Sequence, residues 1–70
     1  MKVNLTEYSQ GEIMKIIREW TDLTQEEFAK EMGKSKRTIE DYEAGRVNYN
    51  IQFIKKLMDN FDIEVIIKKK

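Results

Sequence analysis

The chain contains no cysteine and no histidine. Without cysteine it can form neither a disulfide nor a thiolate zinc site. Without histidine it lacks the commonest general base and metal ligand. No hydrophobic run approaches the roughly 20 residues of a membrane span, and the start of the chain has no signal-peptide core. We therefore expect a soluble cytoplasmic protein that makes no use of a membrane.

Catalytic signatures are missing as well. The sequence has no glycine-rich phosphate loop, no nucleophile–base pair and no cofactor fingerprint. Its acidic residues alternate with lysines along expected helix faces, which is the pattern of a solvated surface. Glu40 and Glu43 share a helix face at i, i+3, but no further ligands accompany them. We expect no enzyme, no cofactor, no metal and no small-molecule ligand.

Neither sign of charge is in excess, because thirteen basic residues balance thirteen acidic ones. A protein that binds nucleic acid normally relies on phosphate neutralisation, so a zero net charge weighs against strong binding by a monomer. The distribution is uneven, however. The basic residues that cluster are Lys34, Lys36, Arg37 and Arg46, whereas the preceding helix is acidic. With 70 residues we expect a single domain, 1–70, whose small core favours dimerisation.

Two helices should flank the centre of the chain. Ser9 and Glu12 form a capping box, so the first helix should begin at Gln10 or Gly11. Its apolar residues recur at helical spacing and should face the core: Ile13, Ile16, Ile17 and Trp20. Asn50 should cap a later helix whose apolar stripe is Ile51, Ile54, Leu57, Met58 and Phe61. Phe53 falls off that stripe and is either a satellite contact or part of a dimer surface.

The stretch 24–45 predicts two short helices joined by a tight turn. Thr24 and Glu27 form a capping box, and Leu23 before them should pack as a hydrophobic staple. Gly33 occupies the position where a helix ends in a left-handed residue, and Gly45 does the same for the second helix. Ser35 caps that second helix. The inward residues are Phe28, Ala29 and Met32 in the first helix and Ile39 and Tyr42 in the second. The outward side chains are of the kinds that read base edges: Lys36, Arg37, Thr38 and Asp41.

This stretch resembles the helix-turn-helix of the Cro and phage-repressor family, also called the xenobiotic-response-element type. The residues that carry the resemblance are Leu23, Thr24, Gln25, Phe28, Ala29, Gly33, Ser35, Thr38, Ile39 and Tyr42 to Gly45. It extends over roughly Ile13 to Phe61. The resemblance implies a mainly α fold of four helices and a sequence-specific regulator that binds double-stranded DNA, as a dimeric Cro-like repressor on a palindromic operator.

The resemblance also implies which residues touch DNA. The second helix of the motif would enter the major groove. The positions that match base-reading residues are Ser35, Lys36, Arg37, Thr38 and Asp41. Arg37 is the first choice for a bidentate contact to guanine, while Asp41 either accepts from cytosine N4 or orients Arg37 from i+4. The phosphate contacts would be Gln25, Lys34, Arg46, Asn48 and Tyr49. In the family the position of Arg18 pairs with that of Glu43, so we expect this salt bridge between the first helix and the recognition helix.

The end of the chain departs from the family, many members of which have a fifth helix here. Residues 62–68 are rich in β-branched residues and alternate, which predicts a strand. Ile63, Val65 and Ile67 should face inward and Ile66 outward. A strand needs a partner, and two are available: the alternating segment Lys2 to Leu5, or the same strand of a second subunit, and both pairings can hold at once. Some Cro-type proteins dimerise through such a strand, and we expect Ile63, Val65, Ile66 and Ile67 to form it here.

Two alternatives remain open from the sequence. An antitoxin that represses its own operon would use the same fold. A protein-interaction module would keep the fold but bind another regulator instead of DNA, with Tyr49, Phe53 and Ile66 as its surface.

Overall fold

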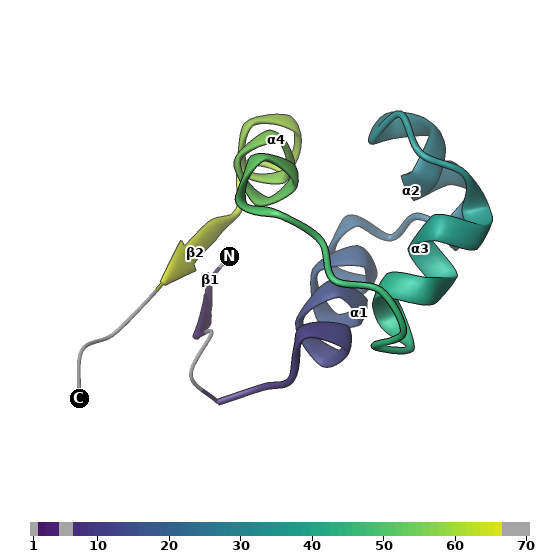
Figure 1. The fold of residues 1–70 in the computed structure, drawn as a ribbon. Helices are drawn as coiled ribbons and strands as arrows, with labels where there is room; N and C mark the ends of the chain where they lie inside the picture. Colours follow the sequence, from purple (N-terminus) through teal and green to yellow (C-terminus); the bar gives the residue numbers. More distant parts are fainter. Residues whose placement is uncertain (1, 5–6, 67–70) are drawn as a thin grey trace.

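The computed structural model describes the backbone of residues 2–4 and 7–66 and the side chains of residues 7–66. Its elements follow the order β1 (Lys2–Asn4), α1 (Gln10–Thr21), α2 (Gln25–Glu31), α3 (Lys36–Glu43), α4 (Ile51–Phe61) and β2 (Glu64–Ile66). The expected mainly helical fold with a short C-terminal strand is confirmed. α2 and α3 lie at one end of the molecule, and the strands lie at the other end beside α4 (Figure 1).

Every helix begins at a polar residue whose side chain accepts from a backbone N–H in the first turn. The four caps are Ser9, Thr24, Ser35 and Asn50. The capping boxes expected at the start of α1 and of α2 are both present. Hydrogen bonds from the backbone and side chain of Ser9 and of Thr24 lower the pKa of Glu12 and of Glu27, respectively. These bonds span only three residues, which is why the helix starts are readable from the sequence.

Four residues with positive φ end the helices, two of them glycines. Gly33 and Gly45 have φ values of 68° and 76°, as expected after α2 and α3. Asp22 and Asp62 end α1 and α4 with φ values of 60° and 53°. The sequence prediction missed both aspartates because it placed left-handed residues only at glycines; a short polar side chain tolerates this conformation better than most.

The buried face of α1 differs from the apolar stripe expected for it. Ile13 and Ile17 are buried, but Met14 is fully buried while Ile16 and Trp20 are only partly so. The buried arc is therefore rotated toward Gly11 and Arg18, because α3 packs on that side of the helix. Periodicity counts apolar residues only and cannot register a contact made through glycine and arginine.

The buried face of α4 also differs from the apolar stripe expected for it. Ile51 was expected in the core but its exposed fraction is 59%, whereas Phe53 is buried at 5%. The Phe53 ring meets the edge of Tyr42 at a centroid distance of 5.2 Å, and Tyr49 lies within 6.0 Å of the same ring. Phe53 thus belongs to an aromatic cluster that joins α3, the following loop and α4. It is excluded from a dimer or partner surface.

The two strands pair in parallel, with Lys2 opposite Glu64, Val3 opposite Val65 and Asn4 opposite Ile66. Of the two partners considered for the C-terminal strand, the N-terminal segment is the one found within the chain. The described strand is Glu64–Ile66; of the expected range 62–68, residues 62 and 63 precede it, and residues 67 and 68 lie outside the described residues. Ile63 is buried and Val65 packs on the core, as expected for inward residues. Ile67 and Leu5 lie outside the described residues.

Candidate nucleic-acid interface

The α2–turn–α3 unit is built by two local hydrogen-bond motifs. At the end of α2 the backbone N–H of Lys34 donates to the Ala29 carbonyl at 2.8 Å, and that of Gly33 donates to Lys30 at 3.3 Å. This pair of bonds around a left-handed glycine is a Schellman motif. Ser35 then caps α3 by accepting from Thr38 N–H at 3.1 Å. The turn is therefore short and fixed, and it sets the direction in which α3 leaves.

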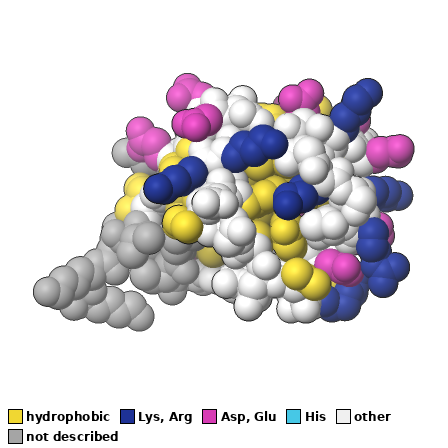
Figure 2. Space-filling view, turned by 45° about the horizontal axis from the view of Figure 1, so that its top comes forward, with side chains coloured by type: hydrophobic (Ala, Val, Ile, Leu, Met, Phe, Trp, Pro, Cys, Tyr) yellow, Lys and Arg dark blue, Asp and Glu magenta, His cyan; other side chains and the backbone are white. Residues whose placement is uncertain are grey.

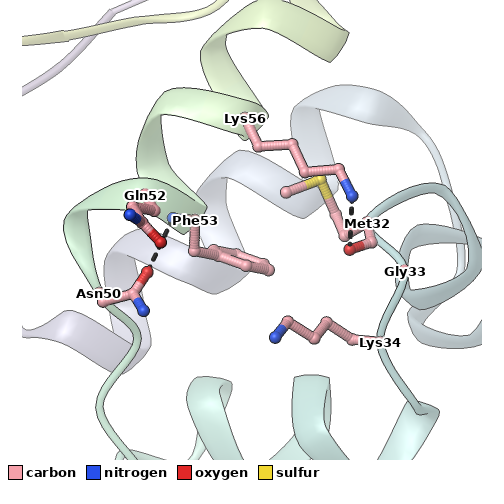
Figure 3. A pocket seen from close by; sticks show the side chains of 7 residues that line it. All are labelled: Met32, Gly33, Lys34, Asn50, Gln52, Phe53 and Lys56. Carbon is pink, nitrogen blue, oxygen red and sulfur yellow. Dashed lines mark hydrogen bonds between the residues drawn. The ribbon is translucent and has the colours of Figure 1, made fainter.

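α4 holds this turn from the other side. Lys56 Nζ donates to the Met32 carbonyl at 3.1 Å, and Asn60 Nδ2 donates to the Glu31 carbonyl at 3.4 Å. These carbonyls are among those left without a partner at the end of α2. Figure 3 shows Lys56 reaching across to Met32, and Lys34 extending from the turn below Phe53. A pocket lies between this turn and the first turns of α4. It is lined by Met32, Gly33, Lys34, Asn50, Gln52, Phe53 and Lys56. The sequence prediction missed the hydrogen bond from Lys56 to Met32, because a lysine that lies off the apolar stripe is normally a solvated residue.

Exposed basic side chains lie at the start of α3 and just after its end. Lys34, Lys36, Arg37 and Arg46 are all exposed, and the side chain of Arg37 is 78% accessible. Figure 2 shows Lys and Arg side chains gathered at the end of the molecule that α2 and α3 occupy. A protein without net charge thus carries a local basic surface, as its sequence indicated. Ser35 and Thr38 lie beside it, with their hydroxyl oxygens 2.9 Å apart.

Asp41 joins two of these cations. Its Oδ1 accepts from Arg37 Nε at 3.3 Å and from Arg46 Nε at 2.9 Å, and Arg46 Nη2 lies 2.8 Å from the same oxygen. The Arg46 hydrogen bond is the main cause that holds the pKa of Asp41 below its ordinary value, and the nearby charge of Arg37 adds to it. The contact with Arg37 is one of the two roles considered for Asp41. The contact with Arg46 was not foreseen.

The expected ion pair between Arg18 and Glu43 is present and locks α1 to the end of α3. Arg18 Nε and Nη2 donate to the two carboxylate oxygens of Glu43 at 2.6 and 3.1 Å, and Arg18 Nη1 donates to the Leu23 carbonyl at 3.1 Å. The side chains are only 16% and 7% exposed. The hydrogen bond to Glu43 raises the pKa of Arg18. Gln25, at the first turn of α2, donates to the same carboxylate at 3.4 Å.

The residues expected to contact phosphate divide into two groups. Lys34, Arg46 and Asn48 are exposed, and Gln25 is partly exposed at the start of α2. Tyr49 differs, since its hydroxyl donates to the Gln10 carbonyl at 2.8 Å and burial raises its pKa. A phosphate accepts hydrogen bonds and offers no donor. In the DNA-free protein the Tyr49 proton is donated within the chain, so this side chain anchors the loop on α1, and its contact with phosphate stays a prediction.

Gly11 is a further residue that the sequence did not single out. It is buried in the first turn of α1, where α1 meets the end of α3. A Cβ atom placed there would lie 2.4 Å from the Glu43 carbonyl oxygen and 3.2 Å from Gly45 N. Only a glycine lets the two helices approach this closely. The sequence did contain one indication of this contact. Gly11 lies inside a capped helix, where glycine lowers helix stability, so its presence there indicates a packing requirement.

Comparisons with known proteins place this geometry in a family. A family model described as helix-turn-helix, of the Cro and repressor type, matches residues 14–66. A search of curated proteins and a search of solved structures returned no significant match. Within the described residues, no helix has the length and apolar character needed to cross a bilayer, and no group of three or more acidic side chains is placed to hold a metal. The chain belongs to the Cro/repressor helix-turn-helix family of DNA-binding transcription regulators.

Proposed function

We propose that this protein is a sequence-specific transcriptional repressor that binds its operator as a homodimer, with α3 in the major groove. The observation that carries the proposal is the exposed basic surface at the start of α3, on a helix whose position is fixed from α1, α2 and α4. In this arrangement Arg37, Lys36 and Asp41 face base edges, with Ser35 and Thr38 beside them. Gln25, Lys34, Arg46 and Asn48 contact phosphates on either side. Two such helices spaced about 34 Å apart would read a near-palindrome.

Truncation of Arg37 and truncation of Arg46 are expected to change DNA binding in different ways. Arg37→Ala should lose about 1–3 kcal/mol of discrimination at one base pair, because the guanidinium can bond guanine O6 and N7 together. Arg46→Ala should weaken binding to all sequences alike and reduce the salt dependence by about one phosphate contact. Selection from a random duplex pool, with each variant run beside the parent chain, measures both effects.

The charge-matched control is Lys55→Ala, which removes one exposed cation from α4, outside the α2–α3 unit. It should leave both the enriched motif and its symmetry unchanged. If Arg37→Ala and Arg46→Ala behave alike, the division into base and phosphate contacts is wrong. If the folded protein enriches no sequence at all, the function lies instead with a protein partner.

The strands support a dimer through the end of the molecule opposite α3. A sheet of two short parallel strands is marginal by itself, and parallel sheets are normally covered on both faces. Within the described residues each strand has one strand neighbour, which leaves a further edge of the sheet for a second copy. Ile66, at the end of β2, is only partly buried. Figure 1 shows that this sheet lies well away from α2 and α3.

We therefore expect Ile66→Glu to shift the protein from dimer to monomer in sedimentation equilibrium, because a carboxylate there would be desolvated by the second subunit. The control is Ile51→Glu, which places the same charge on an apolar residue that is 59% exposed at the start of α4. Loss of the dimer in the control alone would move the subunit contact to the surface around Ile51, which includes Tyr8, an aromatic residue that is 43% exposed and lines the same pocket. Circular dichroism checks that both variants remain folded.

A further inference from the structure

Asp41 stands in the middle of the basic surface of α3 and contacts both arginines on it. The three contacts, from Arg37 Nε, Arg46 Nε and Arg46 Nη2, converge on Oδ1 at 3.3, 2.9 and 2.8 Å, and none of them uses Oδ2. The arginine side chains are 78% and 58% exposed, whereas that of Asp41 is 20% exposed. The carboxylate is thus the inner member of the group and the guanidinium groups are the outer ones.

Local backbone geometry holds this group together. Arg37 and Asp41 are four residues apart on α3, a spacing at which helix side chains meet. Arg46 follows Gly45, whose positive φ closes a second Schellman motif: Arg46 N–H donates to the Asp41 carbonyl at 2.9 Å, and Gly45 N–H donates to Tyr42 at 3.2 Å. The motif returns the chain to Asp41, so Arg46 lies beside the carboxylate in the DNA-free protein.

A carboxylate offers an arginine the same charge-assisted hydrogen bonds that a phosphate offers. We infer that Asp41 determines specificity by competing with DNA phosphates for Arg46 and Arg37, so that it weakens non-specific DNA binding more than operator binding. This inference rests on the proposed function. A phosphate that takes either arginine leaves Asp41 facing the negative duplex. In the operator complex α3 lies in register with the bases, so Oδ2 can accept from the amino group of a cytosine or adenine at one fixed position, whereas a complex held by phosphate contacts alone does not place such a group beside it.

Asp41→Asn tests this role, since it keeps the size of the side chain and removes its charge. The variant should bind a random-sequence duplex about 3–10-fold more tightly near 0.1 M salt, with a log–log salt slope steeper by about 1, as one more arginine becomes available to phosphate. Binding to the selected operator should change less, so the ratio of operator to random-duplex affinity should fall. Titrations of both duplexes over a range of salt concentrations measure these quantities.

The matched control is Glu40→Gln, which removes one negative charge from the same helix without touching the arginine contacts. An equal change in both variants would mean that Asp41 acts through net charge alone and would overturn the inference. In an Arg46→Ala background the effect of Asp41→Asn should shrink; an undiminished effect would also overturn it. If neither the parent chain nor Asp41→Asn binds DNA, the proposed function itself fails, which is a separate outcome. Melting temperatures close to that of the parent show that the variants are folded.

Discussion

Replacing Arg18 with alanine is expected to remove about 3 kcal/mol of folding free energy, the largest effect of any change considered. Arg18 donates to both oxygens of Glu43, which is only 7% exposed, and to the Leu23 carbonyl. Without it, Glu43 remains as a charged side chain that is only 7% exposed, and its other hydrogen bond among the described residues, from Gln25, is long. Breaking a buried pair on one side costs about 3–5 kcal/mol, and the pair here is partly exposed. A core of this size supplies about the same amount, so the variant should be largely unfolded at 37 °C.

Urea denaturation followed by circular dichroism measures this loss. Lys15→Ala is the control, because it removes an exposed cation from the same helix and should shift the midpoint little. The double change Arg18→Met with Glu43→Leu removes both charges and should recover much of the stability, since no carboxylate is left unpaired. An unchanged midpoint for Arg18→Ala would show that the pair contributes nothing to folding. A double variant as unstable as the single one would show that the loss of stability comes from lost packing and not from an unpaired charge.

Replacing Gly11 with alanine is expected to destabilise the protein by about 1–2 kcal/mol, although alanine is the better helix former. Helix propensity alone favours alanine by up to about 1 kcal/mol. The added Cβ, however, would lie 2.4 Å from the Glu43 carbonyl oxygen, a backbone atom with no freedom to rotate away. Inserting a methyl group into a close-packed contact typically costs about 1–3 kcal/mol, and here the clash should outweigh the gain. The backbone at the end of α3 must shift, so DNA affinity should fall as well.

Gln10→Ala is the neighbouring control, because it adds alanine to the same turn at an exposed position. It should leave stability and DNA affinity nearly unchanged. Thermal unfolding and titration with the selected operator measure both variants. A Gly11→Ala protein that melts at a higher temperature than the parent would show that α1 and α3 have room to separate, and that the glycine is not required for their approach.

The starts of the helices and the ends of α2 and α3 followed from the sequence because each is fixed by bonds across three to five residues, whereas the ends of α1 and α4 at Asp22 and Asp62 were missed. Thr24 with Glu27, Ser9 with Glu12, and the glycines at 33 and 45 act where they were expected. The Arg18–Glu43 pair joins residues 25 apart, and it could be expected only because the motif resembles a family that has it. Local periodicity and capping alone would not have found it.

The sequence by itself determined the helices, their caps and the concentration of basic residues around α3. The inward faces of α2 and α3 also followed from it, but tertiary structure alone decided which residues of α1 and α4 are buried: Met14 and Phe53 rather than Ile16 and Ile51. It also decided that β2 pairs in parallel with β1, that Lys56 donates to the Met32 carbonyl before α3, and that the Tyr49 hydroxyl donates to the Gln10 carbonyl of α1. Each of these depends on where elements distant in the chain come to lie. Hydrophobic burial has no direction of its own, so the neighbouring helices, and not the local pattern, select the residues that it covers.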